Sequence, residues 1–392
     1  MDTEQPARNI AEEPTSLGKA NGPVGHNVPD GFVPKLSGDL VWEGSSYATT
    51  SEKYVRVLSA AEIEEVELAM KYFKNLALPY GLISPQTFPL SRQLATDLAG
   101  ISDTLHTGRG FNVVRGLNSS KYTMEDNIII YMGIVSHITP VFGADPDKMV
   151  LGHVRDATKD AVLPGDHRKL AVSKYPEFLN FHTDVGLGDI VSLYTYGMAA
   201  TGGSQQLASF WRIYNELVEH RPDVLATLCQ GWPIEGKDPE TLLPKDLDRP
   251  LIFCEKERVI IQLSRQVLLG TTNLPRSAEL PSLNASQIEA LAVLDELCNK
   301  YSFVVEQQQG DILFVNNFGI LHARDAWKDS CDRKRHLFRI LSKDPRNAWD
   351  KPAIVADEWE KNLSYDPATL FIPLADFDPR GRTACAASDA HG

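Results

Sequence analysis

The stretch that decides the fold is Gly310-Asp311-Ile312-Leu313-Phe314-Val315-Asn316-Asn317-Phe318-Gly319-Ile320-Leu321-His322. Its first apolar run lies between a Gly-Asp turn and two asparagines, which predicts a buried β-strand. The asparagines predict a polar corner, where we expect them to satisfy backbone groups rather than to bind a substrate. The stretch therefore predicts a turn, a strand and a corner that is followed by a histidine.

Short β-favouring runs recur from about residue 150 onward, at residues 189–197, 250–254, 259–263, 302–306 and 311–315. The turn between the second and third runs predicts a hairpin. Helical patterns come mostly earlier in the chain. Ser59-x-x-Glu62 is a capping box, residues 90–106 and 123–138 show helical spacing, and Ser286-x-x-Glu289 predicts a helix that continues to about Lys300. Together with a strand at 108–117, this order predicts an α+β fold built on an antiparallel barrel or sandwich.

The chain has 392 residues, of which 43% are hydrophobic and 23% charged, an ordinary globular balance. Residues 1–40 are poor in large apolar side chains, and we expect a flexible N-terminal arm there. Residues 379–392 predict a flexible tail for the same reason. We therefore expect one domain over residues 41–378, although the length alone also allows two.

The net charge is −13, which disfavours nucleic acid and anionic membranes as partners. No apolar run is long enough to span a membrane, and residues 1–14 lack the order of a signal peptide. The five cysteines form no C-x-x-C pair. We expect a cytoplasmic enzyme or binding protein for a small molecule. Its oligomeric state is undecided, with a homodimer left open.

Residues 324–346 differ from the rest of the chain in charge, since eight basic and four acidic residues give them a local charge of +4.

His182-Thr183-Asp184 is the second informative segment. In a strand, positions i and i+2 share a face, so His182 and Asp184 could bind one ion. This motif alone is weak evidence, since a hydrogen-bonded surface pair explains it better. With His322 it forms the two-histidine, one-carboxylate set of non-haem Fe(II) oxygenases. Arg335 and Arg339 would share the face of another strand, where an arginine fork suits a carboxylate.

These motifs, in this order, resemble the TauD/TfdA family of Fe(II)- and 2-oxoglutarate-dependent dioxygenases, which includes clavaminate synthase-like enzymes. The segments at 110–117 and 201–204 (Thr-Gly-Gly-Ser) fit the same pattern. The resemblance implies a double-stranded β-helix, or jelly roll, flanked by helices. It implies His182, Asp184 and His322 as catalytic iron ligands, and O2 and 2-oxoglutarate as cosubstrates. Arg335 would bind the distal carboxylate of 2-oxoglutarate, with Arg339 near the active site.

One position departs from the family pattern, because many members have a threonine that contacts 2-oxoglutarate where this chain has Gln205. The neighbouring Ser204 is therefore a second candidate for that contact. Candidate substrate contacts are Asn180, Phe181, Tyr196, Arg324 and Arg265. The alternatives are core packing for Tyr196 and a surface salt bridge for Arg324.

The resemblance implies oxidation of a substrate C–H bond, by hydroxylation, desaturation or cyclisation, with release of succinate and CO2. Asp184 argues against a halogenase, which lacks the carboxylate ligand. We expect an amino acid or an intermediate of secondary metabolism as the substrate. Two alternatives are a metal-dependent jelly-roll oxygenase that does not use 2-oxoglutarate and a catalytically silent jelly-roll binding protein.

Overall fold

The structure is a computed structural model that describes residues 28–158, 171–186, 188–237, 241, 243–271 and 275–374. The predicted tail at 379–392 and the first 27 residues of the predicted arm lie outside this part. Residues 28–40 differ from the flexible arm that the sequence predicts. Leu36 and Leu40 are buried, and the Leu36 backbone N–H donates to the side chain of Asn215 on helix α4 (Phe210–His220).

The larger of two main sheets has seven strands and contains the strand that the opening stretch predicts. Its order is β1 (Val55–Val57), β2 (Phe111–Arg115), β14 (Ile312–Asn316), β6 (Ile190–Gly197), β17 (His336–Lys343) and β3 (Val141–Phe142), and β4 (Gly152–Arg155) also pairs with β17. β1 and β2 are parallel, whereas the other pairs are antiparallel.

The smaller main sheet has four strands, in the order β13 (Phe303–Val304), β8 (Gln205–Ser209), β15 (Ile320–Arg324) and β5 (Leu179–His182). Three two-stranded ribbons extend from the core: β7 (Thr201–Gly202) with β16 (Trp327–Lys328), β9 (Glu235–Lys237) with β10 (Pro244–Asp246), and β11 (Ile252–Glu255) with β12 (Arg258–Ile261). The last ribbon confirms the hairpin predicted after residue 254.

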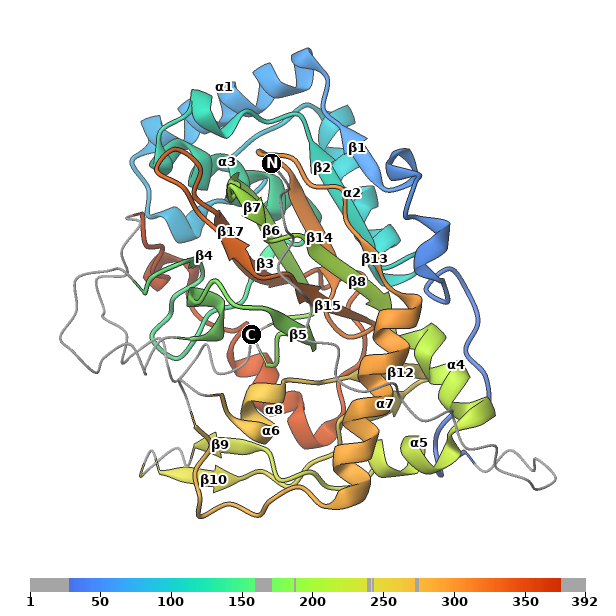
Figure 1. Ribbon diagram of the computed structural model, residues 1–392. Coiled ribbons are helices and arrows are strands. Elements are labelled where there is room, and N and C mark those ends of the chain that lie inside the picture. The colour runs from blue at the N-terminus through green and yellow to red at the C-terminus, as the bar shows by residue number, and fades with distance from the viewer. Residues whose placement is uncertain are drawn as a thin grey trace, which may run out of the picture.

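The two main sheets share a core, because alternate side chains of each point toward the other. Val191, Leu313 and Leu341 of the large sheet lie in one cluster with Leu207 and Ile320 of the small sheet. Both sheets also bury their outer faces under helices (Figure 1). The strands are therefore apolar on both sides, which explains the continuous apolar runs in the sequence.

The helices cover the outer faces of the sheets in two groups (Figure 1). Their bounds are α1 (Ala60–Leu76), α2 (Arg92–His106), α3 (Met124–Ile138), α4, α5 (Pro222–Leu228), α6 (Arg265–Leu269), α7 (Ala285–Tyr301) and α8 (Ala353–Lys361). Helices α1 to α3 pack on the large sheet, and α4, α5 and α7 on the small one. Short 3₁₀ turns lie at Gly44–Ser46, Ser51–Lys53, Tyr80–Leu82, Ser119–Lys121, Val172–Lys174 and Pro367–Thr369.

The helix starts confirm the sequence analysis, with one correction. Ser59 and Glu62 form the predicted capping box of α1. Helix α7, however, is capped by Asn284. The Asn284 side chain accepts from the Gln287 backbone N–H, and the Gln287 side chain accepts from the Asn284 backbone N–H. Ser286 already lies inside the helix. The prediction missed this start because Asn-x-x-Gln is an equally good capping box, two residues upstream of Ser286-x-x-Glu289.

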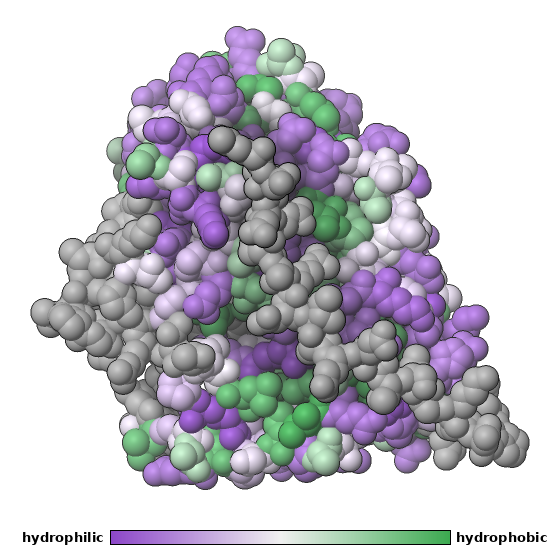
Figure 2. Space-filling model, in the orientation of Figure 1, coloured by the Kyte–Doolittle hydropathy of each residue, from purple (hydrophilic) through white to green (hydrophobic). Residues whose placement is uncertain are grey.

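The surface is mostly hydrophilic in the upper part of Figure 2, and hydrophobic residues gather below, where Figure 1 places α6, β9 and β10. Leu243 and Leu269 are among the exposed apolar side chains. No helix within the described ranges is both long and apolar enough to cross a membrane.

Replacing the α7 cap tests this helix start. Asn284→Ala should lower the free energy of unfolding by about 1 kcal/mol, because the Gln287 backbone N–H loses its side-chain acceptor. Ser286→Ala is the matched control and should change it by less than about 0.5 kcal/mol. Urea unfolding of both variants measures the difference, and equal losses would contradict the start at Asn284.

Candidate metal centre

The pairing of β15 with its two neighbours brings the predicted metal-binding residues together. His322 on β15 lies opposite His182 on β5 and opposite Leu207 on β8. The two imidazole rings are 4.2 Å apart between centroids. Asp184 follows two residues after His182, just beyond the end of β5. One potential ligand atom from each of the three residues lies within 4.8 Å of the others.

The geometry at the three side chains is that of a small, buried donor set. The distance from Asp184 Oδ1 is 3.9 Å to His182 Nε2 and 4.0 Å to His322 Nε2. His182 Nδ1 lies 2.7 Å from the Asn180 carbonyl oxygen, so its N–H donates there. This bond leaves the lone pair of Nε2 directed at the carboxylate side, as in many metal-binding histidines.

Burial keeps both imidazoles neutral, which is the form that binds a metal. It lowers the pKa of His182, and it lowers the pKa of His322 well below its usual value, with His182 and Arg339 adding to the effect. Asp184 Oδ2 is buried without a hydrogen-bond partner in the described part of the chain. Two neutral imidazoles and such a carboxylate fit a divalent cation of the Fe(II) kind, with coordination positions left for other ligands.

Arg335 directly precedes β17 and lines the same cavity as the three residues. Its Nε is 3.3 Å from the Gly203 carbonyl oxygen, and its guanidinium lies 4.9 Å from the Trp327 ring centroid. Burial lowers its pKa to about 10, so it stays charged at neutral pH. Its Nη1 is buried and has no partner among the described residues. A buried cation of this kind favours an anionic ligand.

Gln205 also lines the cavity, and both of its amide atoms are buried without partners in the described part of the structure. It therefore offers a donor and an acceptor beside Arg335. Ser204 lies one residue earlier, where its backbone carbonyl accepts from Asp325, and it does not line the cavity. Of the two candidates for contact with the cosubstrate, the geometry favours Gln205.

Arg324 and Arg339 both face the cavity, as Arg335 does. Arg339 Nη1 lies 3.5 Å from Asp184 Oδ1. The Arg324 guanidinium donates to the carbonyls of Tyr175 and Glu177 and lies 4.3 Å from the Trp327 ring centroid. Its side chain is buried, so the surface salt bridge considered from the sequence is not its role. The expected face shared by Arg335 and Arg339 is present.

Phe181 and Tyr196 do not line the cavity: Phe181 differs from its expected substrate contact, and Tyr196 follows the core-packing alternative. Phe181 points to the opposite side of β5 from His182 and packs in the cluster of α4, α5 and α7. Tyr196 lies on the helix side of β6, with its ring stacked 5.1 Å from that of Phe338. Leu193, on the inner side of the same strand, lines the cavity instead. Alternation of side chains along the strand places both aromatic rings on the outer face.

Arg265 and Asn180 also differ from the expected substrate contacts. Arg265 on α6 forms an ion pair with Asp295 at 2.6 Å and donates to the Leu291 carbonyl, so its guanidinium is bound to α7. The Asn180 side chain is exposed, and this residue reaches the site only through its carbonyl oxygen. The sequence analysis missed the apolar part of the lining, which comprises Val154, Leu179, Leu193, Ala323 and Leu337.

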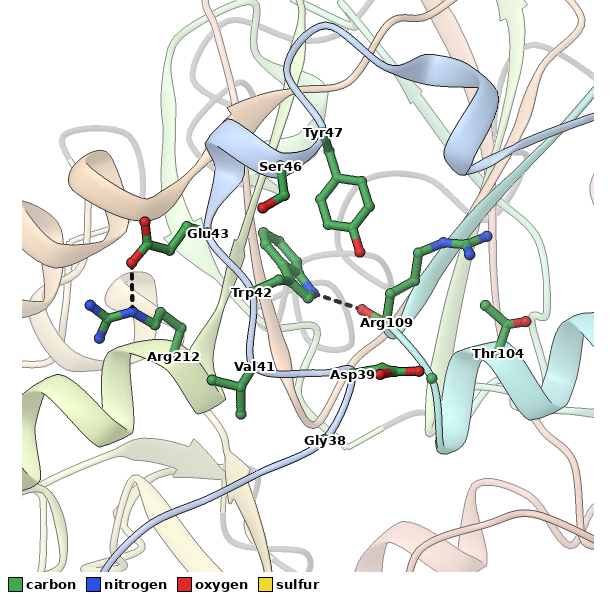
Figure 3. Close-up of a pocket in the computed structure, with 11 residues that line it drawn as sticks. Gly38, Asp39, Val41, Trp42, Glu43, Ser46, Tyr47, Thr104, Arg109 and Arg212 are labelled. Atoms are coloured by element: carbon green, nitrogen blue, oxygen red, sulfur yellow. Dashed lines mark hydrogen bonds and ion pairs between the residues drawn. The ribbon is translucent and has the colours of Figure 1, made fainter.

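A second cavity, of about 680 Å³, lies between the segment 38–47, the end of α2 and α4 (Figure 3). Two interactions tie its walls together. Trp42 Nε1 donates to the Arg109 carbonyl at 2.8 Å, and Arg212 pairs with Glu43 at 3.0 Å. Among the described residues, the His182 group is the one arrangement suited to a metal, and it does not belong to this cavity.

A jelly-roll core with two imidazoles and one carboxylate in its cavity defines the class of non-haem iron oxygenases. The family described as "Taurine catabolism dioxygenase TauD, TfdA family" matches residues 74–341, more than half of the sequence. The chain belongs to this family and is an Fe(II)- and 2-oxoglutarate-dependent dioxygenase that uses O2. This assignment confirms the first prediction from the sequence and sets aside the oxygenase without 2-oxoglutarate and the silent binding protein.

Two curated proteins resemble the chain along most of its length. The taurine hydroxylase-like protein SAT17 of Stachybotrys chartarum is 35% identical over 342 residues, covering 85% of this chain and 86% of that protein. The FR-33289 synthase of Streptomyces rubellomurinus is 24% identical over 316 residues, covering 78% of this chain and 89% of the synthase. The first of these supports the family assignment independently of the motif matches.

Solved structures with the same fold confirm the double-stranded β-helix. An asparagine oxygenase bound to Fe(II), 3-hydroxyasparagine and succinate has a TM-score of 0.54 at 16% identity, covering 77% of this chain and 98% of that one. The non-haem iron oxygenase OrfP bound to Fe and α-ketoglutaric acid has a TM-score of 0.52 at 15% identity, covering 77% and 98%. At these identities the likeness concerns the fold alone.

Substitution of Gly203 tests how Arg335 is placed. Gly203 has φ +78°, and a Cβ there would lie 2.8 Å from Arg335 Cδ. Gly203→Ala should therefore displace the guanidinium and, on the cosubstrate contact that the resemblance implies for Arg335, raise the KM for 2-oxoglutarate about tenfold, equivalent to roughly 1.4 kcal/mol. Gly100→Ala on α2, where a Cβ meets open space, is the control and should leave the KM unchanged. An unchanged KM in Gly203→Ala would show that Arg335 does not depend on this close approach.

Proposed function

We propose that His182, Asp184 and His322 hold the iron, and that Arg335 binds the distal carboxylate of 2-oxoglutarate with help from Gln205. The observation that carries this proposal is the buried convergence of two imidazole nitrogens and one carboxylate oxygen within 4.8 Å. The buried Arg335 guanidinium in the same cavity supports the second part. Other sites in the described part of the chain lack this combination of donors and cation.

The residues of the chain position the reactants, and the cofactor supplies the oxidising power. Bound Fe(II), together with 2-oxoglutarate and O2, provides the chemistry that breaks a substrate C–H bond while succinate and CO2 are released. His182 and His322 would present neutral Nε2 atoms, and Asp184 one carboxylate oxygen. Leu193 and Leu337 form apolar walls that limit the access of water to the reacting centre.

For the substrate, we propose a small molecule with a carboxylate or comparable anionic group, such as an amino acid. Arg324 and Arg335 are buried cations that face the cavity. The distal carboxylate of 2-oxoglutarate would pair with Arg335, which leaves Arg324 for an anionic group of the substrate. Solved structures of the asparagine oxygenase and of OrfP contain 3-hydroxyasparagine and (3S)-hydroxy-L-Arg, which are both hydroxylated amino acids. We further propose hydroxylation as the reaction outcome, which the hydroxylated amino acids in those structures support, and a role in secondary metabolism.

We also propose that the enzyme works in the cytoplasm and has no nucleic-acid or membrane partner. Cys229, Cys254, Cys298 and Cys331 are free thiols, which suits a reducing compartment. The net charge of −13 disfavours polyanionic partners. Sedimentation of the full-length protein distinguishes a monomer from a homodimer.

A succinate-release screen tests the reaction and the substrate class together. The wild-type enzyme with Fe(II), 2-oxoglutarate and O2 should form succinate in step with oxidised product for at least one amino acid or sulfonate, and not for neutral analogues. His322→Ala should lose turnover and iron retention, because one ligand nitrogen is removed. Full activity of His322→Ala would contradict the site, and a preference for neutral substrates would contradict the anionic class.

The role of Arg335 is tested by binding rather than turnover. Arg335→Ala should weaken 2-oxoglutarate by about 2–5 kcal/mol, because the carboxylate loses a buried charged partner. Arg335→Lys keeps the charge without the planar fork, so its affinity for 2-oxoglutarate should lie between those of the wild type and Arg335→Ala. Anaerobic calorimetry with iron-loaded protein measures both. An unchanged affinity in Arg335→Ala would assign the contact to another residue.

A further inference from the structure

Asp184 differs from the two histidines of the metal centre in how its backbone is held. His182 belongs to β5 and His322 to β15, so the sheet fixes their main chains. Asp184 lies beyond the end of β5. Its Oδ2 has no hydrogen-bond partner in the described part of the chain, and Arg339 is 3.5 Å from Oδ1. Arg339 therefore contacts the carboxylate itself, whereas the backbone that carries this carboxylate needs a support other than the sheet.

The backbone of Asp184 is bound by the side chain of Asn317, which lies between β14 and β15. Asn317 Oδ1 accepts from the Asp184 N–H at 2.8 Å, and Asn317 Nδ2 donates to the Asp184 carbonyl. The same Nδ2 donates to the Gly188 carbonyl at 3.2 Å. The Asn317 backbone N–H donates to the Asp189 carbonyl at 2.8 Å. The amide is fully buried and uses its acceptor and both donors in these contacts.

We propose that Asn317 is a positioning residue that sets the orientation of Asp184 toward the metal. This inference rests on the proposed role of Asp184 as an iron ligand. Because Asn317 precedes His322 by five residues, its amide connects the segment of one ligand to the corner that leads into β15, the strand that carries another. A carboxylate at this position has no N–H donors, and a hydroxyl is too short to bind both sides of the Asp184 backbone. The amide also has no group left for a substrate.

The residue before Asp184 is held in a similar way, which shows why the amide matters. The Thr183 N–H donates to the Leu263 carbonyl at 2.8 Å, and the Leu263 N–H donates to Thr183 Oγ1 at 3.0 Å. The segment is thus fixed on one side by Leu263 and on the other by Asn317. Loss of Asn317 would free only the side that bears the carboxylate. Groups that orient metal ligands typically affect metal affinity by about 10–100-fold.

Asn316 provides a matched control. It is also buried, and its side chain likewise forms three bonds to backbone groups, accepting from Phe318 and Gly319 and donating to Leu105. None of these groups belongs to the segment of Asp184. Asn316→Ala and Asn317→Ala therefore remove equal numbers of buried hydrogen bonds at adjacent positions, and only one of them touches the proposed ligand.

The test is anaerobic titration of the full-length, metal-free protein with Fe(II) alone, without 2-oxoglutarate or substrate. Both variants should lower Tm, but only Asn317→Ala should weaken Fe(II) binding, by about 10–100-fold. Asn316→Ala should stay within about threefold of the wild type. If Asn317→Ala does not fold, Asn317→Ser replaces it, with the same expected loss.

Two results would overturn the inference: wild-type Fe(II) affinity in the folded Asn317 variant, or an equal loss in Asn316→Ala, which would indicate general loosening of the corner. Asp184→Ala separates this outcome from a failure of the site itself. If Asp184→Ala binds Fe(II) as well as the wild type, the ligand assignment fails. If it loses binding while the Asn317 variant does not, only the role of Asn317 fails.

Discussion

The antiparallel register of β15 is the constraint on which the site depends. It places His322 opposite His182 on one side and opposite Leu207 on the other. Since successive side chains of a strand alternate between faces, a shift of one residue would turn His322 toward the helices and separate the imidazoles. The same register directs Arg324 into the cavity and Leu321 into the core under the helices of the small sheet. Metal site and core packing are thus specified by one set of backbone hydrogen bonds.

The burial of several arginines in one cavity, with Asp184 as the one acidic side chain among the described residues of its lining, is the second physical feature of the site. Three arginines, two histidines and one aspartate face a small cavity between apolar walls. The imidazoles stay neutral there, whereas Arg335 keeps its charge at neutral pH. Buried cations with few acidic partners are costly in the free protein, and anionic ligands offset this cost when they bind. Preorganised charge of this kind favours small anions over neutral molecules.

Local patterns predicted the elements of the fold well, because capping boxes and helical spacing are written in neighbouring residues. Ser59 caps α1 as expected. The cap of α7 is Asn284, and the prediction placed it at Ser286 because two possible capping boxes overlap there. Residues 28–40 looked too polar to order themselves, but Leu36 and Leu40 pack on elements distant in the chain. That packing depends on tertiary contacts, which local composition does not reveal.

The candidate ligands and Arg335 were predictable from motif order, but the rest of the cavity was not. Strands buried on both faces have no polar side that indicates which residues point inward, so Phe181 was expected on the wrong face and Tyr196 was left between substrate contact and core packing. Leu193 was missed for the same reason. Arg265 was expected near the site from its position after a strand, whereas Asp295 on α7 holds it elsewhere. The role of Asn317 required the geometry of a corner between two sheets.

The most direct test of the central claim is an anaerobic crystal structure of the full-length protein with Fe(II), with the metal located by its anomalous scattering. The account predicts one strong peak bonded to His182 Nε2, His322 Nε2 and an oxygen of Asp184, at roughly 2.0–2.2 Å from each. A peak at other residues, or a site that lacks any one of these three ligands, would contradict it.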